Sequence, residues 1–184
     1  NKVLALATRI DGGAAAQLQF DNATNMTQKL AAFACLLTAE KGADAVDTFY
    51  NEWQNDRLVI DKWFAIQVSA APPDKAADIA QALTLHTDFD MKNPNRFRAT
   101  LGALAGKTAG FHHASGKGYT LLADWLIKLD PLNPQTTARM CSAFETWRRY
   151  DSHRKELIET ELRRIFATKG LSRDTTEMVA RILG

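Results

Sequence analysis

The sequence has little of what stabilises a small disulfide-rich domain or embeds a protein in a membrane. It contains two cysteines and five prolines in 184 residues, and its charge is nearly balanced, with 23 basic against 21 acidic residues. No stretch approaches the run of about 20 apolar residues that a membrane-spanning helix needs. A chain of this length buries enough surface to fold without disulfides or a metal. A net charge of +2 gives no overall electrostatic case for binding nucleic acid or an anionic membrane.

The two cysteines, Cys35 and Cys141, are both flanked by apolar residues in a helical pattern. This arrangement fits buried thiols in a reducing compartment better than a disulfide framework, so we expect a cytoplasmic, bacterial protein. The first ten residues lack the charged start, long apolar run and cleavage site of a signal peptide. Because the chain begins with Asn1 instead of methionine, we expect it to be a fragment of a larger protein.

The spacing of apolar residues predicts helices nearly everywhere and no strand. Large apolar residues recur at three- and four-residue steps in 26–39 and in the segment after Asp151, which is typical of one face of an amphipathic helix. Start signals with Pro, Asp, Asn or Ser predict further helices at 75–85, 135–150 and 173–183.

Frequent glycines and prolines divide the pattern into about ten short helices. Short helices with one apolar face bury it most readily as antiparallel hairpins stacked side by side, as in armadillo or HEAT-like solenoids. We therefore predict a single all-α domain over residues 1–184, folded as an α-α superhelix.

Residues with the spacing of a metal or catalytic site are missing from the sequence. The four histidines are His86, His112, His113 and His153, and no two of them are four apart on a helix, as zinc ligands often are. No Gly-x-Ser-x-Gly elbow occurs, and each cysteine lies in apolar surroundings that favour packing over reactivity. We predict no catalytic residue, no metal site and no cofactor in this chain.

Seven short strings point to a known family. They occur in the order and spacing found in the C-terminal domain of bacterial aminopeptidase N, of the M1 zinc metallopeptidase family, and the resemblance spans nearly the whole chain. The strings are DNATNMT (21–27), FYNEW (49–53), LVIDKWF (58–64), NPNRFR (93–98), GKGY (116–119), DPLNPQ (130–135) and RRYD (148–151).

The resemblance implies a multidomain parent enzyme that removes N-terminal amino acids from peptides. In that family the zinc ligands, the general-base Glu, the transition-state-stabilising Tyr and the loop that holds the substrate amine belong to earlier domains. The C-terminal domain resembles a helical superhelix that caps the catalytic domain and encloses the active-site cavity. The chain is therefore expected to be inactive alone, with the catalytic domain of the same polypeptide and peptide substrates as its partners, and with zinc bound only in the parent's catalytic domain.

The resemblance also implies three substrate-binding residues: Arg98, Gln135 and Arg139. In relatives the matching positions face the active-site cavity. Gln135 and Arg139 are one helical turn apart and hence lie on one face. An arginine in a closed chamber can bind peptide carbonyls or the C-terminal carboxylate of a short peptide. The alternative is that Arg98 and Arg139 make structural salt bridges to neighbouring helices or to the catalytic domain.

Two other functions compete with this interpretation. A stand-alone helical-repeat scaffold that binds protein partners has the same helical pattern. The small excess of basic residues after Arg139 offers a nucleic-acid surface, but opposite charges four residues apart, such as Glu159 and Arg163, favour a solvated helix face.

Overall fold

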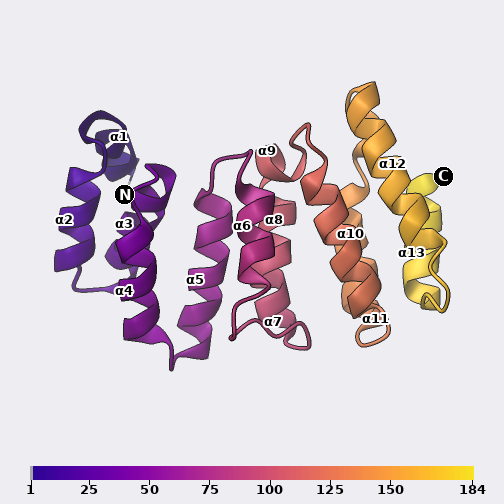
Figure 1. The fold of residues 1–184 in the computed structure, drawn as a ribbon, viewed down its shortest axis with the longest axis horizontal. Helices are drawn as coiled ribbons and strands as arrows, with labels where there is room; N and C mark the ends of the chain where they lie inside the picture. The colour runs from indigo at the N-terminus through magenta and orange to yellow at the C-terminus, as the bar shows by residue number, and fades with distance from the viewer. Residues whose placement is uncertain (1) are drawn as a thin grey trace. The chain divides into compact units, whose positions relative to one another are not determined.

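The computed structural model describes residues 2–184, and these are helical throughout, with no strand among them (Figure 1). The predicted all-α fold class is confirmed. The chain divides into two compact units, one ending at Pro72 and one running from Pro73 to Gly184.

The first unit contains five helices: α1 (Lys2–Asp11), α2 (Ala14–Asn22), α3 (Met26–Thr38), α4 (Ala43–Trp53) and α5 (Arg57–Ala70). In Figure 1, α3, α4 and α5 stand side by side, and all three pack on one another. The predicted helix at 26–39 is thus confirmed as α3.

Stacked aromatic rings fill the core of the first unit. Phe33 and Phe49 are fully buried and stack with ring centroids 5.2 Å apart. Trp63 on α5 packs edge-on against Phe64, and its Nε1 donates a hydrogen bond of 3.0 Å to the carbonyl of Val46 on α4. These contacts fix α5 against α4.

The second unit has more and shorter elements. They are α6 (Ala76–Leu83), α7 (Pro94–Phe97), the π-helical turn η1 (Arg98–Gly102), α8 (Ala103–Gly106), α9 (Thr108–Phe111), α10 (Lys117–Leu129), α11 (Pro134–Cys141), the 3₁₀ turns η2 (Ser142–Phe144) and η3 (Trp147–Arg149), α12 (Ser152–Phe166) and α13 (Arg173–Leu183). In Figure 1, α10, α12 and α13 lie side by side, in agreement with their packing.

The prediction of one helix over 135–150 is wrong, because α11 ends at Cys141 and two 3₁₀ turns follow. Cys141, Phe144 and Trp147 are all buried, and their three-residue spacing matches the three residues per turn of a 3₁₀-helix. Ser142 adds to the break, since its hydroxyl donates to the carbonyl of Arg139 at 2.7 Å. Packing of these side chains therefore overrides the helical pattern of the sequence.

Two of the three predicted helix starts are confirmed by caps. The side chain of Asn133 accepts a hydrogen bond from the Thr136 amide, and that of Ser172 accepts one from the Thr175 amide. Asp74 does not cap α6, which begins at Ala76 without any side-chain cap.

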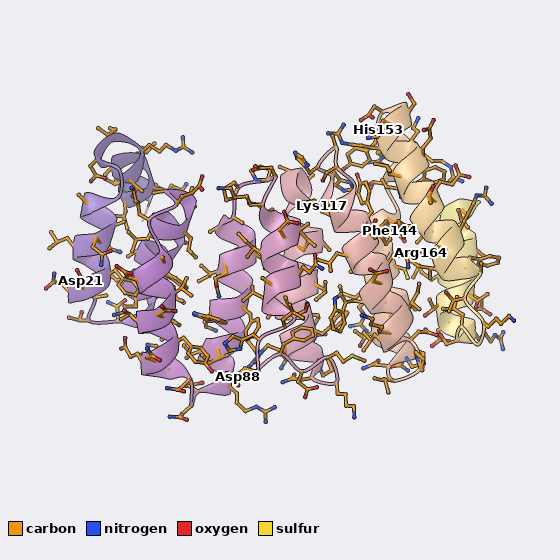
Figure 2. All side chains as sticks on the ribbon, in the orientation of Figure 1. Asp21, Asp88, Lys117, Phe144, His153 and Arg164 are labelled. Atoms are coloured by element: carbon orange, nitrogen blue, oxygen red, sulfur yellow. The ribbon has the colours of Figure 1, made fainter. Side chains whose placement is uncertain are left out.

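The core of the second unit is an aromatic cluster joined to α12 by ion pairs. The rings of Phe111 and Tyr119 meet edge-on at 5.2 Å, and Phe144, labelled in Figure 2, packs against Phe111 at 5.5 Å. Arg164 on α12, also labelled, pairs with Asp124 of α10 at 2.8 Å (Figure 2). These contacts hold α10 and α12 together.

The two thiols differ in burial. Cys141 is fully buried, and burial raises the pKa of its thiol to about 12. Cys35 is only half-buried, so the expectation of buried thiols is correct for Cys141 alone; both cysteines are free.

Candidate substrate-contacting surface

The string at 93–98 forms a helix start in which neighbouring residues do different work. Asn93 accepts hydrogen bonds from the amides of Asn95 and Arg96, and Pro94 occupies the first helical turn, where its missing N–H costs nothing. Arg96 is buried, and its guanidinium donates to the carbonyl of Asp88. The first arginine of the string is therefore structural.

Arg98, the second arginine, is exposed. It opens the π-helical turn η1, and its Nη2 donates a hydrogen bond of 2.8 Å to Oδ1 of Asn95. A Cβ on Gly102, one turn further along, would lie 3.4 Å from the Cβ of Arg98. Gly102 therefore leaves room beside the stem of Arg98, and Asn95 directs its head.

Gln135 and Arg139 both lie on α11, are both exposed and line the same hollow. Asn133 and Pro134 begin the helix, so that the two side chains project from one face, one turn apart. The structure thus brings two of the three predicted substrate-binding residues together. Arg98 does not line this hollow.

The hollow has a volume of about 470 Å³ and is formed by α11 and α13. Two ion pairs neutralise part of its rim: Glu177 with Arg173 at 2.7 Å, and Arg181 with Glu145 at 2.6 Å. The lining residues are Gln135, Ala138, Arg139, Asp174, Glu177, Met178 and Arg181.

Three polar side chains of the hollow, those of Gln135, Arg139 and Asp174, make no hydrogen bond or ion pair with any residue in 2–184. The alternative prediction, that Arg98 and Arg139 form salt bridges to neighbouring helices, finds no such bridge within the described part of the chain. The free side chains offer a guanidinium, a carboxylate and an amide in one place.

Asp130 fixes the two walls of the hollow relative to each other. Its carboxylate lies just before α11 and accepts from the amide of Ser172 at 2.6 Å, from the Ser172 hydroxyl at 2.7 Å and from the Thr175 hydroxyl at 2.5 Å, all at the start of α13. At the other end Nε1 of Trp147 donates to the carbonyl of Ile182 at 2.9 Å. The starts of α11 and α13 therefore lie together, and so do their ends.

The sequence analysis missed Asp130 and Asp174. Asp130 stands inside the DPLNPQ string, whose Pro and Asn suggest only a turn, and its partners lie more than 40 residues away. Asp174 looks like an ordinary acidic residue in the first turn of a helix. Only the packing of α13 against α11 brings either residue to the hollow.

A second polar cluster joins the strings GKGY and RRYD. His112 stacks on Tyr150 with ring centroids 4.0 Å apart, its Nδ1 lies 3.0 Å from the Tyr119 hydroxyl, and Nε of Arg154 donates to its carbonyl at 2.6 Å. Burial, and then the charge of Arg154, lower the pKa of His112, whereas burial raises the pKa of Tyr119 to about 12. Gly118 belongs to the same arrangement, because a Cβ there would lie 2.7 Å from the carbonyl oxygen of Phe111.

Residues 2–184 contain no group of three or more His, Cys, Asp or Glu side chains that could hold a metal ion. No helix among them is both long and apolar enough to cross a membrane. The zinc of the resembling family therefore finds no ligand set in the described part of this chain.

Comparison with known proteins shows the class first. The fold is that of ARM repeats: the family model described as "Domain of unknown function (DUF3458_C) ARM repeats" matches residues 1–184. The chain belongs to this family, the C-terminal ARM-repeat domain of bacterial aminopeptidase N in the M1 family. The resemblance inferred from the seven strings is thereby confirmed.

Three curated relatives share the name Aminopeptidase N. The chain is 41% identical to the protein of Caulobacter vibrioides over 141 residues, 38% identical to that of Haemophilus influenzae over 173 residues, and 35% identical to that of Escherichia coli K12 over 168 residues. These matches cover 76%, 91% and 90% of this chain but only 16%, 19% and 19% of the relatives. The chain thus spans less than a fifth of their length.

A solved structure gives the same result. The crystal structure of Legionella pneumophila aminopeptidase A in complex with aspartic acid matches with a TM-score of 0.87 and 32% sequence identity, over 96% of this chain and 21% of that one.

Proposed function

We propose that this chain serves a zinc-dependent aminopeptidase as the domain that caps the active-site cavity and helps admit and orient peptide substrates. The observation that carries the proposal is the pair of side chains on α11: Gln135 and Arg139 lie one turn apart, line one hollow and have no partner among residues 2–184. Exposed polar groups without partners are available to a ligand.

Binding and orientation are the work assigned to these residues. The Arg139 guanidinium is permanently charged and matches the two oxygens of a peptide's C-terminal carboxylate. The Gln135 amide both donates to and accepts from a peptide bond. Arg98, held by Asn95, adds a second cation on a different element. Zinc, when bound in the catalytic domain of the parent, supplies the activated water, and none of the three residues transfers a proton.

An exposed apolar face on α1 supports a covalently attached partner domain. Val3, Leu6 and Ile10 follow one another at three- and four-residue steps and are 78%, 60% and 89% exposed. Such a stripe at helical spacing is typical of a surface that another protein covers. In this proposal the partner is the catalytic domain of the same polypeptide, in the bacterial cytoplasm.

Activity measurements on the purified 184-residue chain test the proposal. With aminoacyl chromogenic substrates and added zinc we expect no turnover, because the described residues hold no metal site. Zinc-dependent hydrolysis by the chain alone would contradict it.

The exposed α1 stripe also fits a second function, that of a stand-alone helical scaffold that binds a separate protein. The coding sequence upstream of Asn1 separates the two: an open reading frame that encodes His-Glu-x-x-His supports the aminopeptidase, and a start codon next to Asn1 supports the scaffold.

A further inference from the structure

The hollow between α11 and α13 carries one free charge of each sign. Arg139 supplies the guanidinium and Asp174 the carboxylate, and neither has a partner among residues 2–184. We propose that this hollow binds a short zwitterionic peptide by both ends, with its carboxylate on Arg139 and its ammonium on Asp174. The binding itself is a property of this chain, and its place in peptide hydrolysis rests on the function proposed above.

The direction of the two helices sets the distance between the charges. Because Asp130 joins the two helix starts and Trp147 joins the two ends, Asp174 lies level with the first turn of α11, while Arg139 lies one turn beyond Gln135. One turn of helix rises about 5.4 Å, and four residues rise about 6 Å. The two ends of an extended dipeptide are about 7 Å apart, so the spacing suits a peptide of this size.

The remaining groups of the hollow fit the middle of such a ligand. Ala138 and Met178 provide apolar surface, and Gln135 offers an amide to the peptide bond. The other charges on the rim already have partners, since Glu177 is paired with Arg173 and Arg181 with Glu145. A zwitterion therefore meets one available cation and one available anion.

A structural explanation exists for each charge taken alone. Asp174 lies in the first turn of α13 and Arg139 in the last turn of α11, where each has the sign that the helix dipole favours. That effect stabilises each helix separately and requires no ligand. It also predicts no dependence of peptide binding on either side chain, which makes the two explanations separable.

The ligand held in this way is a peptide that is not reacting. An aminopeptidase acts on the residue that carries the free ammonium, and an ammonium bound by Asp174 is occupied in this hollow. The site therefore suits the shortened peptide left after removal of a residue, which again carries a free ammonium and a carboxylate.

Titration of the isotopically labelled 184-residue chain with alanyl-alanine tests the proposal, followed by amide chemical shifts of Ala138 and Met178. The matched ligands are N-acetyl-alanyl-alanine and alanyl-alanine amide, each of which lacks one charge. The variants are Asp174→Asn and Arg139→Gln, with Arg163→Gln as a control, because Arg163 is exposed on α12 and does not line the hollow. The spectrum of each variant also reports whether it is folded.

We expect the free dipeptide to bind, and removal of either charge to weaken binding about two- to fivefold, the range for an exposed ion pair. N-acetylation should have no further effect in Asp174→Asn, and amidation none in Arg139→Gln. The proposal is overturned if the dipeptide causes no shifts at the hollow, or if the blocked peptides bind the folded wild type as well as the free one. Neither result bears on whether Arg139 contacts substrate in an intact enzyme, which kinetic measurements test separately.

Discussion

Nη2 of Arg98 lies 2.8 Å from Oδ1 of Asn95, three residues earlier in the same string. Both residues belong to the helix start that Asn93 caps, so the direction of Arg98 is set locally, by its own string and the π-helical turn that follows. An exposed arginine held in this way loses less conformational freedom when it binds a ligand.

Replacement of Asn95 by Ala should release the Arg98 side chain without unfolding the domain, because Asn95 is exposed and Asn93 still caps the helix. We expect the order parameter of the Arg98 Nε–H bond to fall. In Asn95→Asp it should be retained, since a carboxylate accepts the same hydrogen bond. Nitrogen-15 relaxation of the arginine side chains measures the effect. An unchanged order parameter in Asn95→Ala would show that Asn95 does not direct Arg98.

Asp130 should be among the most sensitive polar residues for stability. It is 2% exposed and accepts three hydrogen bonds from Ser172 and Thr175. Asp130→Ala leaves these donors unsatisfied and should lower the free energy of unfolding by about 2–4 kcal/mol, measured by urea denaturation. Asp124→Ala is the control, since Asp124 makes a partly exposed ion pair worth at most about 1 kcal/mol. Equal losses in the two variants would refute the role of Asp130 in fixing α13.

Acidification should destabilise the second unit through His112. Burial and Arg154 lower the pKa of His112 below its ordinary value of 6.5, which the residue regains in the unfolded chain. Between the two pKa values the unfolded state binds more protons, so stability rises with pH and falls as pH decreases below about 6.5. His112 should therefore add to the slope of stability against pH.

Urea denaturation between about pH 5 and 8 measures this slope. We expect His112→Gln to have a shallower slope than the wild type, and His113→Gln, from the same loop, to keep the wild-type slope. If His112→Gln follows the wild type throughout, His112 does not contribute to the pH dependence.

Local signals account for what the sequence could predict. The period of the apolar residues and the caps Asn133 and Ser172 specify α11 and α13 from neighbouring residues alone, and the all-α class follows from such patterns. The resemblance supplied Gln135 and Arg139, and their spacing placed them on one face.

The remainder depends on contacts between residues far apart in sequence. The end of α11 at Cys141 results from burial of Phe144 and Trp147, whose environment the helical period does not reveal. Asp174 joins Arg139 only because Asp130 fixes the start of α13. The charge that completes the hollow is thus a product of packing.

Kinetics of Arg139→Ala in a full-length aminopeptidase that carries this domain test the central claim most directly, that Arg139 orients peptide substrates. We predict that KM rises about tenfold for a tripeptide, the loss expected for one charge-assisted hydrogen-bonded contact. KM for a single-residue chromogenic substrate, which has no carboxylate to bind, should change little. Equal changes in KM for the two substrates would contradict the account and make Arg139 a structural residue.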